Sequence, residues 1–390
     1  MSVFQPSEIL LPQGADLQKW AVIACDQFTS EPDYWRRVRE NAKDAPSAIN
    51  LILPESELGL PDEAQKIETI HETMRRYLEN NVFAAYPDSF IYVERTLLSG
   101  AVRRGVVGQI DLTAYDYTAG STSRVRATEK TVVERIPPRL RVREGASLEL
   151  PHVLLLCDDA EKTVIEPLSA EDLPTLYDFE LMEGGGHIRG KLVSGEAKTR
   201  LVQRIAAYEN AHPALTYAVG DGNHSLATAK AAYEKGQSRY ALVELENVRD
   251  DALVFEPIHR IVTETDVPAL LTALEKACGA PDGFAVGVLT GKTRQTVTLD
   301  RAKGELAVAV LQSFLDDWLK THAGKLDYIH GEAAVQTLAA QKNAVGFLLP
   351  AMEKAALFRG VERDGVLPRK TFSMGHAQEK RYYLEARRIV

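Results

Sequence analysis

The chain has 390 residues, of which 45% are hydrophobic and 26% are charged, and its formal net charge is −9 at pH 7. This composition is typical of a soluble globular protein and excludes collagen, coiled coil and intrinsic disorder as the main structure. The negative charge argues against a broad surface for nucleic acid or membrane, because both partners are anionic. At this length two domains are expected.

Three cysteines, Cys25, Cys157 and Cys278, lie far apart and form no CxxC pair. The sequence therefore supports neither a disulfide framework nor a cysteine zinc site, and we predict no metal-binding residues. The N-terminal residues lack a basic segment followed by an apolar run, which predicts no signal peptide. No run reaches the roughly 18 apolar residues of a membrane span. We expect a cytoplasmic protein with no membrane partner.

Apolar spacing and turn signals predict a regular series of elements in the first part of the chain. They are a helix at 62–80, a hairpin of strands at 90–98 and 101–112, strands at 152–159 and 187–193, a helix at 197–212, a strand at 215–220, a helix at 226–236 and a strand at 240–245.

After about residue 262 helices and strands continue to alternate, which predicts a mixed α/β (α+β) fold. The expected helices are 268–278, 309–321 and 332–341, and the expected strands are 284–289, 295–299 and 344–349. We predict an N-terminal α/β domain over 1–265 and a C-terminal α/β domain over 266–390.

The segment Asp221-Gly222-Asn223-His224-Ser225 lies between a predicted strand and a predicted helix. Backbone N–H groups at such a helix start, together with the helix dipole, attract an anion such as phosphate. The polar side chains of this loop could also hold a hydroxyl or move a proton. The alternative is an Asx turn with a capping residue and no ligand, and the residues alone leave both open.

The segment VGDGNHSLATAK (219–230) resembles the DGHHR loop of the bacterial family known as domain of unknown function 1015. Other segments resemble that family in its own order, namely RATEKT (126–131), GGGHIRG (184–190), EPIHR (256–260) and LPRKTFSMG (367–375). The family is similar to the ParB and sulfiredoxin superfamily. The resemblance implies a mixed sheet with flanking helices and a C-terminal α/β extension.

The resemblance also implies a function. The equivalent superfamily loop holds nucleotide phosphates, and some ParB-like proteins are kinases for free serine. It therefore implies a nucleotide substrate such as ATP or ADP, Mg²⁺, and phosphoryl transfer to a small hydroxylated metabolite. Two positions depart from the family pattern: Ser225 replaces an arginine that would clamp phosphate, and Thr128 replaces a histidine.

Within this hypothesis the catalytic candidates are Asp221, His224 and Glu129, because carboxylates and imidazoles transfer protons and carboxylates also suit Mg²⁺. Each also has a structural alternative, such as an exposed ion pair or a hydrogen-bonded histidine. The candidates for binding phosphate or nucleotide are Gly222, Asn223, Ser225, Arg126, Thr131, His187, Arg189, His259, Arg260 and Lys370. His187 and Arg189 alternate on one predicted strand and should share a face, whereas His259 and Arg260 should diverge.

Two other functions compete with the kinase. One is a nucleotide or metabolite sensor without turnover, which the loss of a cation at Ser225 favours. The other is a DNA-associated ParB-like protein, which the net charge and the lack of a helix-turn-helix signal disfavour, so nucleic acid is not an expected partner. Cys25 ends an apolar strand with no visible activating partner, so the sequence does not predict a nucleophilic thiol. The oligomeric state stays open.

Overall fold

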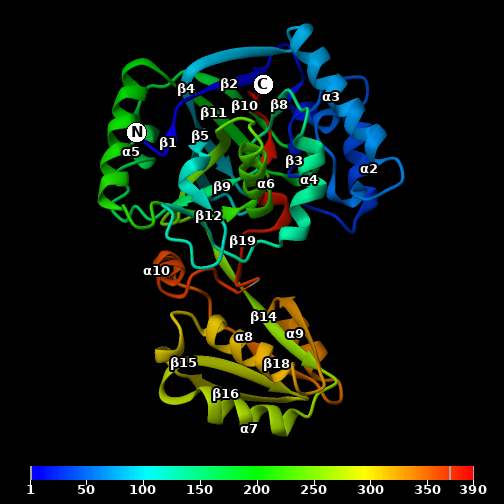
Figure 1. Ribbon diagram of the computed structural model, residues 1–390, viewed down its shortest axis with the longest axis vertical. Helices are drawn as coiled ribbons and strands as arrows, with labels where there is room; N and C mark the ends of the chain where they lie inside the picture. Colours follow the sequence, from blue (N-terminus) through cyan, green and yellow to red (C-terminus); the bar gives the residue numbers. More distant parts are fainter. Residues whose placement is uncertain (1, 369, 390) are drawn as a thin grey trace. The chain divides into compact units, whose positions relative to one another are not determined.

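The computed structural model describes residues 2–368 and 370–389. They form two compact units (Figure 1), of which unit 1 comprises Met1–Ala127, Thr131–Leu253 and Gly375–Val390, and unit 2 comprises Thr128–Lys130 and Val254–Met374. The sequence analysis predicted one boundary, between domains over 1–265 and 266–390, whereas each observed unit is made of more than one segment of the chain. Strand β14 (Phe255–Thr263) pairs with strands of unit 2, and the end of the chain returns to unit 1.

Unit 1 is built on a mixed 11-stranded sheet. Its strands are β1 (Phe4–Gln5), β2 (Ser7–Pro12), β4 (Phe83–Thr96), β5 (Val102–Asp111), β6 (Tyr115–Asp116), β7 (Val125–Ala127), β9 (Leu154–Cys157), β10 (Thr175–Glu180), β11 (His187–Val193), β12 (Tyr217–Asp221) and β13 (Tyr240–Asn247). The order is β10-β11-β4-β5-β13-β9-β12-β7-β6, with β1 on β5 and β2 on β4. Parallel pairs (β7–β12, β9–β13, β6–β7) occur beside antiparallel ones. The predicted mixed α/β class is confirmed, whereas the ParB/sulfiredoxin-like topology stays a prediction.

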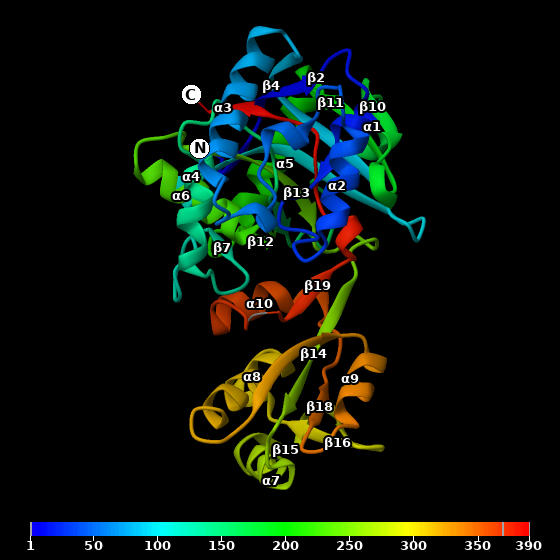
Figure 2. The same cartoon turned by 90° about the vertical axis from the view of Figure 1, so that its right-hand side faces the viewer.

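Helices cover both faces of this sheet, as Figure 2 shows from the side. They are α1 (Leu17–Trp20), α2 (Pro32–Asn41), α3 (Glu63–Glu79), α4 (Ile136–Arg143), α5 (Gly195–Ala211) and α6 (Asn223–Glu234). Alternate residues of β4 enter two separate cores, since side chains along a strand point to opposite faces. Phe90 and Tyr92 pack with residues of α5 and α6, whereas Ile91 and Val93 pack with residues of α1, α2 and α3.

Two short strand pairs attach the C-terminal segment to unit 1. Strand β20 (Tyr382–Tyr383) pairs with β3 (Val22–Ile23), and β21 (Arg387–Arg388) pairs with β8 (Leu148–Glu149). The pairing places Tyr383 opposite Val22, three positions before Cys25. Residues from both ends of the chain therefore meet in one part of unit 1.

Unit 2 has its own six-stranded sheet, of order β16-β15-β18-β14-β17 with β19 on β14. Its other elements are β15 (Gly279–Thr290), β16 (Thr293–Leu299), β17 (Lys325–His330), β18 (Val345–Leu348), β19 (Phe372–Met374), α7 (Val267–Cys278), α8 (Ala307–Trp318), α9 (Glu332–Ala339) and α10 (Lys354–Asp364). Its core includes Ile261, Leu289, Val335 and Leu348. None of the helices described for either unit combines the length and the apolar character needed to cross a bilayer.

Candidate functional site

Helix α6 begins directly after the buried strand β12, at the segment that the sequence singled out. Gly222 is its N-cap and has φ +79°, a left-handed conformation that side-chain-bearing residues rarely adopt. The helix starts at Asn223, three residues earlier than predicted, because Gly222 turns the chain immediately. Asn223 and Ser225 therefore belong to the first helical turn, where N–H groups have no partner within the helix and the dipole is positive.

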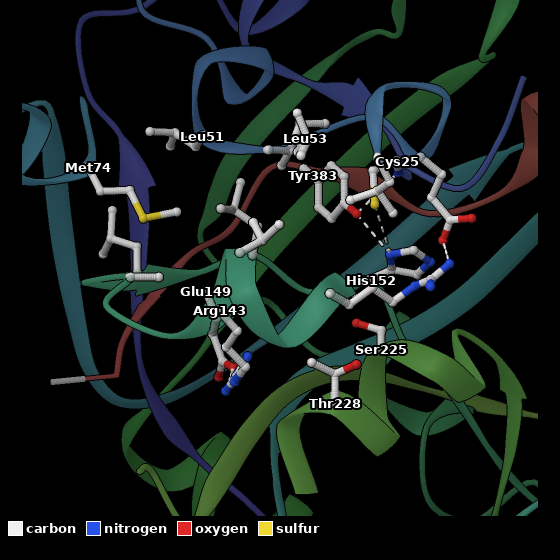
Figure 3. Close-up of a pocket in the computed structure, with 18 residues that line it drawn as sticks. Cys25, Leu51, Leu53, Met74, Arg143, Glu149, His152, Ser225, Thr228 and Tyr383 are labelled. Atoms are coloured by element: carbon white, nitrogen blue, oxygen red, sulfur yellow. Dashed lines mark hydrogen bonds and ion pairs between the residues drawn. The ribbon is translucent and has the colours of Figure 1, made fainter. Parts of the chain in front are cut away.

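The first turn of α6 forms part of the wall of a pocket of about 140 Å³ in unit 1. Ser225 and Thr228 come from α6, and Cys25, His152 and Tyr383 line the same end of the pocket (Figure 3). The other end is apolar and includes Leu51, Ile52, Leu53, Leu58, Met74, Val142, Leu148 and Leu150. An apolar cavity with a few polar groups gathered at one end is typical of a small-molecule site.

His152 is the centre of the polar end. Its Nε2 lies 3.2 Å from Asp26 Oδ1, and its Nδ1 lies 2.8 Å from the Tyr383 hydroxyl and 3.9 Å from Cys25 Sγ. The Cys25 backbone N–H donates to the Tyr383 hydroxyl at 3.2 Å. Figure 3 shows Cys25, His152 and Tyr383 directed toward one another, with Ser225 beside them.

His152 and Asp26 form an ion pair, and each shifts the pKa of the other toward the charged form. Burial lowers the pKa of His152, but the Asp26 carboxylate outweighs burial and holds this pKa well above 6.5. Burial raises the pKa of Asp26, but the charge and hydrogen bond of His152 outweigh burial and hold this pKa below its ordinary value of 3.8. At neutral pH the pocket therefore contains an imidazolium beside a carboxylate.

Lys380 links this ion pair to the loop before α6. Its Nζ lies 3.5 Å from Asp221 Oδ2, and its charge contributes to the lowered pKa of Asp26. Gly222 lies close to His152, because a Cβ built on Gly222 would be 3.1 Å from His152 Cδ2. The structure thus brings the loop together with Asp26, His152 and Lys380.

Two arginines of α4 also line the pocket, and α4 packs along α6. The Arg139 side chain forms an ion pair with Glu55, and Arg143 Nη2 lies 2.6 Å from Glu149 Oε2. Burial lowers the pKa of the Arg139 guanidinium, while the negative groups of Cys25 and Asp26 act in the opposite direction. Arg139 is therefore a partly buried cation at the polar end.

Three other residues of unit 1 that were predicted to bind or react with the ligand lie outside the pocket; they are His224, Arg126 and Thr131. Val132 N–H donates to His224 Nε2 at 3.1 Å. The Arg126 guanidinium donates to the backbone carbonyls of Ser123, Ser121 and Ala214 at 3.0, 3.3 and 2.9 Å. Thr131 is buried, and its hydroxyl has no hydrogen-bond partner within the described residues. None of these three residues lines the pocket.

His187 and Arg189 lie on β11 and share a face, as predicted. His187 Nε2 lies 2.7 Å from Asp178 Oδ1, and Arg189 Nε donates to Asp178 Oδ2 at 2.7 Å. Strands β4, β5, β13 and β9 separate β11 from β12 in the sheet. The two residues are therefore not brought to the pocket.

Four predicted residues belong to unit 2. Glu129 accepts a hydrogen bond from Thr371 N–H at 3.3 Å, and His259 Nδ1 accepts one from Leu349 N–H at 3.1 Å. The buried Arg260 donates to Gln312 Oε1 at 2.8 Å, and burial lowers its pKa to about 10. Lys370 Nζ lies 5.7 Å from the centre of the Tyr328 ring. Glu129 thus lies in a different unit from Asp221 and His224.

The sequence analysis missed the residues that complete the pocket. Cys25 was recognised only as the end of a strand, and Arg139 only as part of a basic segment that either an anionic ligand or a solvated face would explain. Asp26, His152, Lys380 and Tyr383 were not among the predicted site residues. A histidine directly before a buried strand, HVLLLC, was the available signal for His152. Among the described residues, no group of three or more His, Cys, Asp or Glu side chains is placed to hold a metal ion.

Comparisons with known proteins give one extensive match. A family model described as "Protein of unknown function (DUF1015)" matches residues 6–388. The search among curated proteins found no match.

Solved structures give distant likenesses. A free serine kinase in complex with AMP has 13% identity and a TM-score of 0.39, over 69% of this chain and 91% of that one. SbnI with C-terminal truncation from Staphylococcus aureus has 10% identity and a TM-score of 0.38, over 69% of this chain and 83% of that one. A conserved hypothetical protein from Pyrococcus furiosus has 12% identity and a TM-score of 0.35, over 71% and 90%. At these TM-scores none of the likenesses assigns a function to this chain.

Proposed function

The chain belongs to the DUF1015 family, and we propose that it binds the phosphate groups of a nucleotide at the start of α6 and transfers a phosphoryl group to a small hydroxylated metabolite. The observation that carries this proposal is the composition of the pocket wall. The first turn of α6, through Ser225, lines the same pocket as Arg139 and His152. A helix N-terminus combined with two cations favours an anion of high charge.

The apolar end of the pocket supports a nucleotide rather than free phosphate. Leucine, isoleucine and methionine side chains form that end, and they would contact the flat, weakly polar face of a base. A ligand with an anionic and an apolar part would match both ends. A bare phosphate would leave the apolar wall in contact with water.

Phosphoryl transfer needs chiefly positioning and neutralisation of charge, and the polar end offers both. The N–H groups of the first turn and the Ser225 hydroxyl would orient the phosphates, while Arg139 and the His152 imidazolium would balance their charge. Asp221 Oδ2 accepts no hydrogen bond within the described residues and lies beside Lys380. It is our candidate for taking the proton of the acceptor hydroxyl.

The described residues contain no group of three or more His, Cys, Asp or Glu side chains placed around one ion. Because Mg²⁺ is commonly held by one or two carboxylates together with the substrate phosphates, the predicted Mg²⁺ stays a prediction. We therefore derive no step through the metal. The roles predicted from the sequence for four residues of unit 2 stay predictions; these residues are Glu129, His259, Arg260 and Lys370. The donors of Arg126, His187 and Arg189 make the contacts described above, and the binding roles predicted for these residues also stay predictions.

A second candidate function is a nucleotide sensor without turnover. It is favoured by Ser225, a neutral residue at the position where the family pattern has a phosphate-clamping cation. Replacement of a cation by a hydroxyl weakens stabilisation of a phosphoryl transition state more than it weakens binding.

Calorimetric titration with ADP, ATP and inorganic phosphate tests the proposal. We expect nucleotide binding with micromolar to millimolar dissociation constants and weaker binding of phosphate. A ligand at 100 times its dissociation constant adds about 2.7 kcal/mol to the stability of the folded state, so a thermal shift gives a second readout. ADP formation from ATP with a panel of hydroxylated metabolites supports the kinase. Binding without turnover supports the sensor, and the absence of binding contradicts both.

A further inference from the structure

Cys25 occupies a position in the pocket that the phosphate proposal does not use. It follows β3 and is partly exposed, and its side chain lines the polar end of the pocket. The sequence analysis found no activating partner for its thiol. In the structure its Sγ faces His152 Nδ1 at 3.9 Å, and the other nitrogen of that ring faces Asp26 at 3.2 Å.

Cys25, His152 and Asp26 thus stand in the order of a nucleophile, an imidazole that exchanges protons and an orienting carboxylate. Asp26 fixes the imidazole with Nε2 toward the carboxylate, which leaves Nδ1 directed at the thiol. Tyr383 holds both partners, because its hydroxyl lies 2.8 Å from His152 Nδ1 and accepts the Cys25 N–H at 3.2 Å. The sulfur-to-nitrogen distance is long for a hydrogen bond, and such contacts are commonly looser without a substrate.

Two cationic side chains, His152 and Arg139, line the pocket together with Cys25. The His152 imidazolium and the Arg139 guanidinium are both close enough to interact with a negative charge on the sulfur. Nearby cations lower the energy of a thiolate, which is the nucleophilic form of cysteine. The two other cysteines, Cys157 and Cys278, are buried and do not line this pocket.

The pocket beyond the sulfur indicates the class of electrophile. Leucine, isoleucine, valine and methionine side chains line the part of the pocket away from His152. This surface matches a hydrocarbon chain, while Arg139 and the Ser225 hydroxyl offer hydrogen bonds to an oxygen atom at the polar end. A carbonyl group carrying an apolar chain satisfies both.

We propose that Cys25 is the nucleophile of a thiol acyltransfer site that takes an ester or thioester with an apolar acyl group. The thiolate attacks the carbonyl carbon, a C–S bond forms, and the bond from the carbonyl carbon to the leaving oxygen or sulfur breaks. His152 gives its proton to the leaving group. Water then attacks the thioester and gives a proton to His152, the C–S bond breaks, and the carboxylic acid and the Cys25 thiolate are released. The net reaction is hydrolysis of the ester by one water molecule.

In this reaction Cys25 is the catalytic residue and Asp26 is a positioning residue. The acyl chain occupies the apolar end, so this activity goes beyond nucleotide binding and does not depend on it. The two proposals share His152 and Arg139, but only the acyl step requires the sulfur atom.

The test uses the full chain with p-nitrophenyl butyrate. We expect a burst of about one equivalent of p-nitrophenolate per chain, as expected for a covalent intermediate, and a butyryl group located by peptide mass spectrometry on the peptide that contains Cys25. Cys25→Ser should abolish the burst, and His152→Gln should slow acylation by about 100-fold or more. Cys278→Ser, which removes a thiol outside the pocket, should acylate like the unmodified chain.

Locating the butyryl group on the unmodified chain tests whether Cys25 is the nucleophile even if a variant fails to fold. A butyryl group on Cys278 or on lysine residues, or the absence of a burst, overturns the proposal. A burst that persists in folded Cys25→Ser does the same. ADP titration of Cys25→Ser separates the two functions, since nucleotide binding should survive this substitution.

Discussion

His152 Nε2 lies 3.2 Å from Asp26 Oδ1, although β4, β5 and α4 lie between the two residues in the sequence. His152 directly precedes β9, and Asp26 follows β3. Their pairing places a positive imidazole next to the first turn of α6. The proposed anion site and the proposed thiol site both depend on this pair.

Replacing Asp26 by asparagine should lower the pKa of His152. Asp26 is the favourable partner that outweighs burial, so its loss leaves burial to favour the neutral imidazole. Proton NMR of the His152 ring over a pH series measures this change. Asp178→Asn is a matched control, because it removes the carboxylate beside His187 and should leave His152 unchanged. An unaltered His152 titration in Asp26→Asn would contradict the ion pair.

The same pair predicts how stability depends on pH. The contribution of His152, whose pKa is raised, is fully present below about pH 6.5 and is lost as the pH rises through its folded-state pKa. The contribution of Asp26, whose pKa is lowered, is present above about pH 3.8 and is lost as the pH falls through its folded-state pKa. The difference in unfolding free energy between the unmodified chain and Asp26→Asn should therefore be largest between about pH 4 and 6.5. Urea unfolding at several pH values measures it.

Gly222→Ala should destabilise the chain and weaken ADP binding. The positive φ strains any side-chain-bearing residue by about 1–3 kcal/mol, and the added Cβ would lie 3.0 Å from Val153 Cα. Gly236→Ala, at φ +90° near the other end of α6 and with nothing within 4 Å, is the control. Urea unfolding should show losses in both variants, whereas only Gly222→Ala should lose affinity. Equal ADP affinity in the two variants would place the ligand elsewhere.

Arg139→Gln should weaken ADP binding by about tenfold or more, since a hydrogen bond from a charged group contributes about 1.5–3 kcal/mol. Arg135→Gln changes an exposed arginine near the start of α4 that does not line the pocket, and ADP affinity should not change. Calorimetric titration compares the two. Equal losses in both variants would indicate general charge attraction rather than a specific contact.

Tyr383→Phe should destabilise unit 1 by about 1–3 kcal/mol, because the substitution leaves the Cys25 N–H without its acceptor. The same change removes the hydroxyl that contacts His152 Nδ1 and should alter the rate at which iodoacetamide alkylates Cys25. Tyr240→Phe, whose ring lies 5.5 Å from the Arg239 guanidinium, should change the stability by less than about 0.5 kcal/mol. An unchanged stability and alkylation rate in Tyr383→Phe would contradict the described contacts.

Local patterns predicted most of the regular structure. The predicted strand at 187–193 coincides with β11, and the predicted helix at 62–80 matches α3 (Glu63–Glu79) within one residue at each end. Helix α4, which contains Pro137 and Pro138, was not predicted. The prolines lie in its first turn, where a missing N–H costs nothing.

The site was harder to predict than the elements, because it depends on contacts between distant segments. The loop before α6 was recognisable from its residues, but the approach of His152 and Cys25 depends on the packing of β3, β9 and β20. Arg126 has the charge expected of a phosphate ligand, yet backbone carbonyls take up its donors. Spacing in the sequence does not reveal which donors the fold will use.

The most direct test of the central claim is titration of the full chain with ADP, alongside Gly222→Ala and Arg139→Gln. We predict saturable binding that both substitutions weaken and that Gly236→Ala and Arg135→Gln leave intact. The absence of binding at millimolar ADP, in protein that unfolds cooperatively, would contradict a nucleotide site at the start of α6. Binding that is unaffected by Gly222→Ala and Arg139→Gln would contradict it equally.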